Sequence, residues 1–217
     1  MLNTRGLLVS LEGIDGCGKT TQAEELRGKL AQNGIACILV REPGGTAVGE
    51  NIRQILLDNR YSPSLQAEML LYMAARSELT EQVILPALFD GKIVVCDRFT
   101  DSTLAYQGYG GGADLKFIRF LSRKATGGIT PHLTILLDLT VEKAAERRGA
   151  SADRMESKDV CFHQRVRRGY LEIARQEPLR VNIVDASGAM EHQSEMIWQI
   201  VQKRIAGRFS ARSGYEF

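Results

Sequence analysis

The sequence predicts an α/β fold: a five-stranded parallel sheet with helices on both faces. Short runs of apolar and β-branched residues alternate with longer amphipathic stretches along the chain. The short runs are largely apolar on both faces, as in strands that are buried within a parallel sheet. At 217 residues the chain is long enough for one sizeable core and short for two. We therefore expect one domain spanning residues 1–217.

Each predicted element follows from its pattern of apolar residues. Five runs rich in Leu, Ile and Val have the length of strands, and they are Leu7–Leu11, Ile35–Val40, Ile93–Cys96, Leu133–Leu137 and Val181–Val184. The longer stretches repeat apolar residues every three or four positions, which indicates helices with one buried face. These helices are expected at Lys19–Asn33, Val48–Asp58, Ser64–Phe89, Leu115–Thr126, Val141–Arg148, Asp159–Gln176 and Met190–Gly207. The tail, Phe209–Phe217, has no periodicity, so we expect it to be flexible.

Composition and charge exclude several classes of protein. A net charge of +2 gives no reason to expect a nucleic-acid partner. No apolar run approaches the roughly 20 residues of a membrane span, and no charged and then apolar leader opens the chain. The four cysteines lie far apart without a CxxC pair, which favours reduced thiols over disulfides or zinc. The sequence therefore predicts a cytoplasmic protein that binds neither nucleic acid nor membrane.

The stretch SLEGIDGCGKTTQ, residues 10–22, has the spacing of a phosphate-binding loop. Gly13, Gly18, Lys19 and Thr20 fit the pattern G-x-x-x-x-G-K-[ST] between a predicted strand and a predicted helix. Small residues let backbone N–H groups close around phosphate oxygens at the positive end of the helix. Lys19 can then reach the β- and γ-phosphates, and Thr20 can ligate Mg²⁺. The ATP site is expected to comprise Gly13, Ile14, Asp15, Gly16, Cys17, Gly18, Lys19, Thr20 and Thr21.

Three further stretches concern the group that receives the phosphate. REPGGT (residues 41–46) follows the second strand, at the carboxyl edge where α/β proteins bind ligands. AEMLLYMAAR (residues 67–76) is helical and places Tyr72 and Arg76 one turn apart on one face. CDRFTDSTLAYQGYG (residues 96–110) carries Asp97 and Arg98 to the tip of the third strand.

Each of these side chains has a purely structural alternative. Arg41 could be a surface charge, Tyr72 a core aromatic and Asp97 a helix cap. Together, however, they place two arginines, an acid and an aromatic ring around the mouth of one sheet. A phosphorylated ring compound would need such a set. Asp97 can only accept hydrogen bonds when ionised, so it suits Mg²⁺ better than phosphate.

The three motifs together resemble those of bacterial thymidylate kinases. The patterns E-G-x-D-G-x-G-K-T-T, R-E-P-G-G-T and D-R-(x)₃-S-T-x-A-Y-Q-G occur in that order, and the resemblance runs from about Leu7 to the last predicted strand. It implies a P-loop kinase fold, a three-layer α/β/α arrangement with a short lid at about residues 147–157. It also implies a homodimer that uses Mg²⁺ and transfers the γ-phosphate of ATP to dTMP, giving dTDP and ADP for dTTP synthesis.

Carried over position by position, the resemblance implies a role for each matching residue. Asp15 would hold the sugar 3′-hydroxyl and help to organise the metal. Tyr72 stands where the family usually has a Phe that stacks on thymine, and Tyr106 would exclude a 2′-hydroxyl. The acceptor phosphate would be held by Arg41, Arg53 and Arg98, and the polar edge of the base by Arg76, Ser102 and Thr103. Pro43 and Gln107 would line the same pocket.

The stretch ERRGASADRMES (residues 146–157) is rich in arginine and lies between two helical patterns. A solvated, charged loop is its structural alternative. A mobile arginine could instead stabilise the charge that develops during phosphoryl transfer. The resemblance implies two arrangements, with the catalytic arginine in the phosphate-binding loop or in the lid. The loop carries no arginine here, so the lid type is expected, with Arg154 as first choice and Arg148 as second.

Other functions remain open at this stage. A deoxynucleoside kinase shares the loop and an arginine-bearing lid, but needs no clamp for an acceptor phosphate. Another nucleoside monophosphate kinase would differ in its acceptor. A small GTPase would usually carry an N-K-x-D string, which does not occur here. Cys17 could be a nucleophile, although its position requires only a modest side chain.

Overall fold

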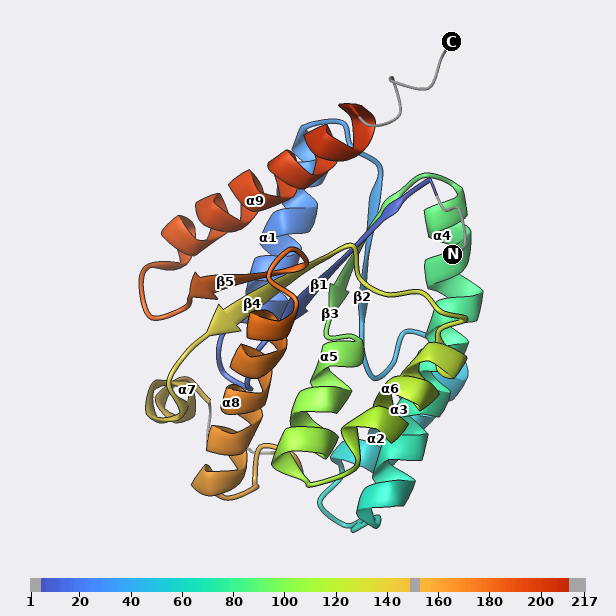
Figure 1. Ribbon diagram of the computed structural model, residues 1–217, viewed down its shortest axis with the longest axis vertical. Coiled ribbons are helices and arrows are strands. Elements are labelled where there is room, and N and C mark those ends of the chain that lie inside the picture. The colour runs from blue at the N-terminus through green and yellow to red at the C-terminus, as the bar shows by residue number, and fades with distance from the viewer. Residues whose placement is uncertain (1–4, 149–152, 211–217) are drawn as a thin grey trace.

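The computed structural model describes residues 5–148 and 153–210 of the chain. Five strands form one parallel sheet in the order β2-β3-β1-β4-β5 (Figure 1). They are β1 (Leu7–Glu12), β2 (Cys37–Arg41), β3 (Ile93–Asp97), β4 (Leu133–Asp138) and β5 (Val181–Asp185). The predicted five-stranded parallel sheet is therefore confirmed.

Every strand ends one residue beyond its predicted end, and that last residue is charged. The five residues are Glu12, Arg41, Asp97, Asp138 and Asp185. The prediction stopped too early because it followed apolar character, whereas the hydrogen-bonded ladder continues to the rim of the sheet. The second strand also begins two residues late, at Cys37 instead of Ile35. Charged side chains are thus gathered at the carboxyl edge of the sheet.

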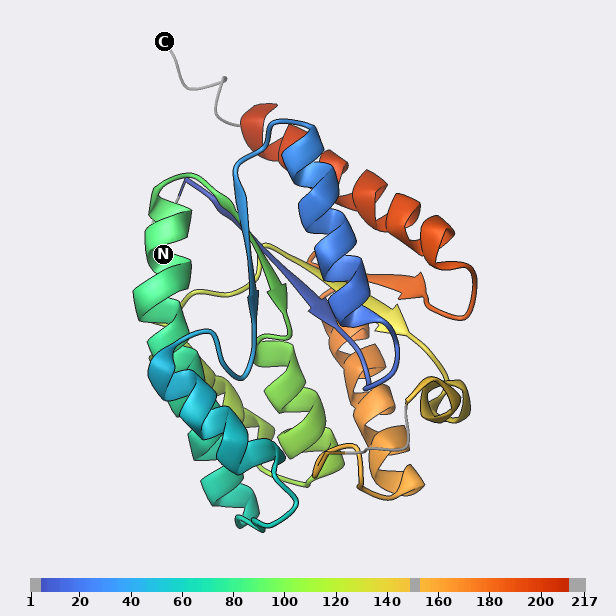
Figure 2. The same cartoon turned by 180° about the vertical axis from the view of Figure 1, so that it is seen from behind.

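Helices cover both faces of the sheet. They are α1 (Lys19–Gln32), α2 (Ala47–Leu57), α3 (Leu65–Leu79), α4 (Leu85–Phe89), α5 (Thr100–Thr103), α6 (Leu115–Ala125), α7 (Val141–Arg147), α8 (Val160–Gln176) and α9 (Met190–Ser210). Helices α1 and α9 lie on one face (Figure 2), and α4, α5 and α8 lie on the other (Figure 1). Helices α2, α3 and α6 gather beside the carboxyl ends of β2 and β3. None of the described helices has the length and apolar character needed to cross a membrane.

Two π-helical stretches in the structure differ from the predicted helices. The expected helix Ser64–Phe89 is divided by η1 (Thr80–Ile84). Pro86 follows it and has no N–H to continue an α-helical ladder, so the hydrogen-bond register changes there. A second stretch, η2 (Leu104–Gly110), continues α5 and was not predicted as helix. The Thr and Ser residues of α5 and the Gly residues of η2 have low helix propensity.

Close packing against α8 holds this unpredicted helical segment in place. Gly169 of α8 faces Tyr109, and a Cβ added to the glycine would lie 2.6 Å from the tyrosine Cβ. Gly110 likewise faces Val166, whose Cγ2 would lie 2.7 Å from an added Cβ. The absence of two side chains therefore lets the two helices approach closely, and tertiary contact replaces local propensity.

Parts of the predicted lid and tail lie outside the described residues. The lid prediction, residues 147–157, includes residues 149–152, which the structure does not describe. Most of the predicted tail, from residue 211 onward, is also outside. Helix α9 continues to Ser210, three residues beyond its predicted end at Gly207.

Candidate active site

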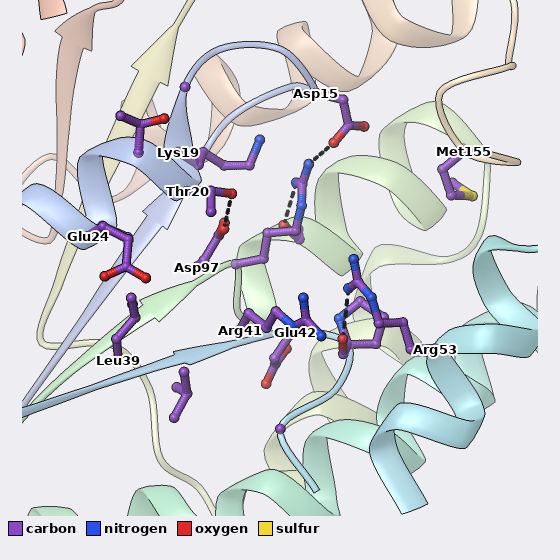
Figure 3. Close-up of a pocket in the computed structure, with 18 of the residues that line it drawn as sticks. Asp15, Lys19, Thr20, Glu24, Leu39, Arg41, Glu42, Arg53, Asp97 and Met155 are labelled. Carbon is purple, nitrogen blue, oxygen red and sulfur yellow. Dashed lines mark hydrogen bonds and ion pairs between the residues drawn. The ribbon is translucent and has the colours of Figure 1, made fainter. Parts of the chain in front are cut away.

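A cavity of about 1410 Å³ opens at the carboxyl edge of the sheet (Figure 3). Its walls come from the phosphate-binding loop and α1, from β2 and the residues after it, and from the segment after β3. The sheet register aligns Asp97 of β3 with Leu11 of β1 and Arg41 of β2, which brings these three strand ends together. Single-ligand pockets usually measure about 300–1,000 Å³. This cavity therefore has room for a donor and an acceptor side by side.

The phosphate-binding loop depends on glycine at positions of close approach. A Cβ on Gly13 would lie 2.5 Å from the carbonyl oxygen of Leu137, closer than carbon and oxygen can pack. Gly18 precedes α1 with φ of 94°, a left-handed conformation that glycine adopts without strain. It is the N-cap residue of α1 and supplies no side-chain cap, and the first three residues of this helix, Lys19, Thr20 and Thr21, line the cavity.

The predicted ATP-site residues divide between the cavity and the inner side of the loop. Those on the cavity wall are Asp15, Gly16, Gly18, Lys19, Thr20 and Thr21. Ile14 and Cys17 are buried at 3% and 0% exposure. The Lys19 ammonium donates to the carbonyl oxygen of Ile14 at 2.8 Å and thus lies across the loop.

Burial raises the pKa of the Cys17 thiol. A thiol that is both buried and protonated is a poor nucleophile. The geometry therefore supports the structural role of Cys17 rather than the nucleophile alternative. Its backbone N–H donates to Ile14 at 3.3 Å and helps to close the loop.

Thr20 and Asp97 face one another in the cavity (Figure 3). The Thr20 hydroxyl donates to Asp97 Oδ2 at 2.6 Å. Hydroxyl and carboxylate oxygens are ligands that suit Mg²⁺, which is usually held by one or two protein groups together with substrate phosphates. Within residues 5–148 and 153–210, no three His, Cys, Asp or Glu side chains form a metal cluster of their own. The donor set here thus fits Mg²⁺ bound with a nucleotide.

Asp15, Arg98 and Tyr106 form a second cluster in the wall of the cavity. Arg98 donates Nη2 to Asp15 Oδ1, and the Tyr106 hydroxyl donates to Asp15 Oδ2 at 2.6 Å. Although burial opposes ionisation, Arg98, Lys19 and the Tyr106 hydrogen bond hold the pKa of Asp15 below its ordinary value. Both Asp15 oxygens are therefore engaged on Arg98 and Tyr106. Because each carboxylate oxygen can accept a second hydrogen bond, Asp15 can also accept one from a hydroxyl group of a ligand in the cavity.

Arg41 and Arg53 bring two further positive charges to the cavity. Arg41, at the end of β2, pairs with Glu50 at 3.2 Å, and Arg53 of α2 donates to the carbonyl oxygen of Pro43 at 2.9 Å. Figure 3 shows both side chains on the same side of the cavity. Burial and the nearby Arg41 lower the pKa of Arg53. Such neighbouring cations are favourable when an anion lies between them.

The remaining predicted acceptor residues also divide between the cavity wall and buried positions behind it. Those on the cavity wall are Pro43, Tyr72, Ser102, Thr103 and Gln107. Arg76 is only 1% exposed, and its guanidinium donates to Glu42 at 2.7 Å and to Thr103 Oγ1 at 2.9 Å. In this conformation Arg76 therefore supports Thr103 from behind the wall instead of presenting its own donors to a base. Burial raises the pKa of Tyr72, so its hydroxyl stays protonated.

The two predicted lid arginines have different surroundings. Arg154 pairs with Glu68 of α3 at 2.6 Å and donates Nε to the carbonyl oxygen of Leu56 at 2.7 Å. Arg148 packs on the phosphate-binding loop, since a Cβ added to Gly16 would lie 3.1 Å from its Cγ. The first choice, Arg154, thus docks on α2 and α3, and the second choice, Arg148, lies on the loop.

Several residues that complete the cavity or its support were missed from the sequence. They are Glu12, Glu42, Glu68, Arg147 and Tyr170. Glu12 could have been noticed, because a carboxylate directly precedes the loop in an otherwise largely apolar strand. Tyr170 is 72 residues from Arg98 in the chain, yet its hydroxyl accepts from Arg98 Nη1 at 3.3 Å. No local pattern marks that contact.

Comparison with known proteins gives a consistent result. The family model described as thymidylate kinase matches residues 11–197. A thymidylate kinase from Synechococcus sp. (strain JA-2-3B'a(2-13)) is 48% identical over 200 residues, which cover 92% of this chain and 96% of the relative. Another from Pelotomaculum thermopropionicum is 49% identical over 189 residues, covering 85% and 88%. A third, from Kosmotoga olearia, is 43% identical over 193 residues, covering 88% and 93%.

Proposed function

The chain belongs to the thymidylate kinase family, and on this premise we propose that the described cavity transfers the γ-phosphate of ATP to dTMP. The enzyme is an ATP:dTMP phosphotransferase that produces dTDP. One observation carries the assignment of the cavity: Arg41, Arg53 and Arg98 open on the same space as the phosphate-binding loop. A nucleoside acceptor has no phosphate and needs no such arginines, whereas a monophosphate does.

The donor side acts by positioning and by electrostatic stabilisation. In phosphoryl transfer the charge spreads over the equatorial oxygens of the transferred group. The Lys19 ammonium and the N-terminal N–H groups of α1 would lie against these oxygens and compensate that charge. Mg²⁺ would neutralise further phosphate charge when bound with ATP, and Thr20 and Asp97 are the residues that would hold it.

The acceptor side holds dTMP in line for attack. Arg98 can form a bidentate contact with the acceptor phosphate, assisted by Arg41 and Arg53. Asp15 would hold the sugar 3′-hydroxyl, and the ring of Tyr72 would stack on thymine. Holding the reacting oxygens close and aligned is worth several orders of magnitude in rate.

Arg148 is the lid arginine that this geometry favours for catalysis. Its side chain already packs on Gly16 of the phosphate-binding loop. Its Nη1 lies 3.4 Å from the carbonyl oxygen of Glu156 and 3.5 Å from His163 Nε2, and these contacts are longer than the 2.6 Å ion pair of Arg154 with Glu68. Arg148 therefore has less to give up before it reaches oxygens bound by the loop. We therefore assign Arg148 to the donor phosphates and Arg154 to docking of the lid segment.

A coupled ADP-release assay tests the proposed function. ATP is offered with dTMP, thymidine or dUMP, and without an acceptor. ADP release that depends on dTMP is the expected result. If thymidine were the better acceptor, the three arginines would need another explanation and the nucleoside kinase alternative would be restored.

Tyr106 is expected to set the preference for deoxyribose. Its ring is 6% exposed and lines the cavity beside Asp15, where a ribose 2′-hydroxyl would project. Tyr106→Ala opens that space, so the preference in kcat/KM for dTMP over its ribose counterpart should fall by about 10-fold. Tyr106→Phe is the matched control, because it keeps the ring and should keep the preference. An unchanged ratio in Tyr106→Ala would remove this residue from sugar recognition.

The surface formed by α3 and α6 supports a homodimer. Leu70 of α3 and Phe117 and Phe120 of α6 are 46%, 43% and 56% exposed, and the two helices pack side by side. Apolar side chains gathered on neighbouring helices are typical of a face that a partner covers. We propose that a second copy of this chain covers it, as the resemblance to a dimeric family implies.

Phe120→Glu should therefore shift the protein from dimer to monomer. A charge placed at the centre of an apolar interface is left unpaired on association. Light scattering coupled to size exclusion gives the mass. Phe89→Glu is the control, since Phe89 is 50% exposed at the end of α4, away from this face. A dimer of unchanged strength in Phe120→Glu would place the interface elsewhere.

The remaining expectations are proposed on the same basis. We take residues 1–217 as one kinase domain, since one parallel sheet runs through the described ranges. We place the enzyme in the cytoplasm. Cys17, Cys37, Cys96 and Cys161 are all free, which suits a reducing compartment.

A further inference from the structure

The backbone of Arg98 adopts an unusual conformation. Its φ is 71°, and among the described residues it is the one non-glycine residue with positive φ. For a residue with a Cβ, this left-handed conformation is uncommon and persists only where the surroundings enforce it. Two hydrogen bonds flank it. Arg98 N donates to the carbonyl oxygen of Leu11 at 3.0 Å, and Phe99 N donates to Glu12 Oε1 at 2.7 Å.

The same carboxylate also reaches the other end of Arg98 through two hydroxyl groups. Ser102 donates to Glu12 Oε2 at 2.6 Å, and Tyr170 donates to it at 3.1 Å. Both hydroxyl oxygens accept from Arg98 Nη1, at 3.2 Å for Ser102 and 3.3 Å for Tyr170. One oxygen of Glu12 thus fixes the backbone next to Arg98, and the other orients the groups that hold its guanidinium.

The chemical groups at the two ends limit the direction of these hydrogen bonds. A guanidinium only donates, and an ionised carboxylate only accepts. Both hydroxyl oxygens therefore accept from Arg98. They also lie 2.8 Å from each other, so one of them donates to Glu12 and the other donates either to Glu12 or to its neighbouring hydroxyl. Glu12 is 0% exposed, so it cannot itself touch a nucleotide in this conformation. Burial and the nearby Asp101 raise the pKa of Glu12 to about 7, whereas the hydrogen bond from Ser102, the charge of Arg98 and the hydrogen bond from Phe99 N favour its ionised form.

We propose that Glu12 is a positioning residue for the acceptor phosphate, acting through Arg98. It holds Arg98 in its left-handed conformation and aims the guanidinium at the cavity. The inference rests on the proposed role of Arg98 in binding dTMP. It assigns to Glu12 a part in acceptor binding, and none in the binding of ATP.

Glu12→Gln tests the proposal with almost no change of volume. The amide keeps one acceptor oxygen but replaces the other by an NH₂ donor, which then opposes the hydroxyl groups that Arg98 also donates to. We expect kcat/KM for dTMP to fall roughly 10- to 100-fold through misalignment, with Kd for ATP within about twofold of wild type. Calorimetric titration with dTMP and, separately, with ATP gives the two affinities.

Tyr170→Phe is the second variant, because it removes one hydroxyl and leaves the ring. It should weaken the binding of dTMP, as Glu12→Gln does. Asp138→Asn is the matched control: Asp138 is a carboxylate at the end of β4 that pairs with Arg167 of α8 at 2.7 Å and takes no part in the hydrogen bonds that join Glu12 to Arg98. It should lower the melting temperature without a selective loss of dTMP affinity. An equal loss of dTMP affinity in Asp138→Asn would reduce the effect to general loosening of the fold and overturn the proposal.

The Arg98→Ala background separates this proposal from the proposed function. If Glu12 acts through Arg98, Glu12→Gln should reduce dTMP affinity only slightly in the Arg98→Ala background. The losses of affinity in the two single variants should therefore not add in the double variant. Full additivity would overturn the role of Glu12 while leaving Arg98 at the acceptor. Unchanged dTMP affinity in Arg98→Ala alone would instead refute the placement of the acceptor site.

Discussion

Lys19→Ala is expected to lower kcat by at least about 100-fold, the usual cost of removing a group that stabilises charge in the transition state. The Lys19 side chain is 6% exposed and lies across the phosphate-binding loop, with its ammonium on the carbonyl oxygen of Ile14. A neutral methyl group would leave the transferring oxygens without that positive charge. Steady-state kinetics with saturating ATP and dTMP measure the loss.

Lys29→Ala is the control for this substitution. Lys29 lies on the same helix, but it pairs at the surface with Glu195 of α9. Its replacement should leave kcat close to the wild-type value. A folded Lys19→Ala enzyme with near-normal turnover would contradict the assignment of the loop to phosphoryl transfer.

Arg98→Ala and Asp97→Asn should fail in different ways, although the residues are neighbours. The Arg98 guanidinium donates to Asp15 and Tyr106, whereas Asp97 accepts from Thr20. Arg98→Ala should raise the KM for dTMP and lower kcat, together by roughly 100-fold or more in kcat/KM, while ATP affinity is nearly unchanged. The reason is that the lost bidentate contact both binds the acceptor and aligns it.

Asp97→Asn should mainly lower kcat and shift the Mg²⁺ dependence to higher concentration. An amide is a weaker ligand for a hard cation than a carboxylate, and dTMP binding does not depend on it. Calorimetric titration of each variant with dTMP and with Mg·ATP separates the two cases. Arg175→Ala, a surface arginine paired with Glu172, is the control. Loss of ATP binding alone in Arg98→Ala would place this arginine at the donor.

The elements that sequence patterns predicted well are those with a local physical cause. The strands could be recognised because both faces of a parallel sheet are buried, and α1 because the loop glycines precede a helical pattern. The segment Thr100–Gly110 could not be recognised as helical. Its stability comes from packing on α8, about 60 residues farther along the chain, which no local propensity records.

The candidate site shows the same division. Lys19, Thr20, Asp97 and Arg98 occur in motifs whose spacing requires their chemistry, and all four line the cavity. Arg76 also stood in a motif, but the direction of its donors depends on groups far away in the chain: the carboxylate of Glu42, the hydroxyl of Thr103 and the carbonyl oxygen of Phe99.

The two lid arginines could not be ranked as catalytic candidates from the sequence for a related reason. Arg148 and Arg154 are both plausible in a charged loop, and the choice depends on which surface each one contacts. Only the fold shows that Glu68 of α3 is available to Arg154.

The close contact between α8 and η2 determines which positions of this enzyme can vary freely. Tyr170 follows Gly169 directly, so any side chain at 169 that pushes α8 away from Tyr109 also withdraws the Tyr170 hydroxyl from Arg98. In a survey of all single substitutions, Gly169 and Gly110 should thus tolerate as little change as the residues that bind the nucleotides. Substitutions at these two glycines, which lie outside the active site, should therefore reduce activity as substitutions within it do.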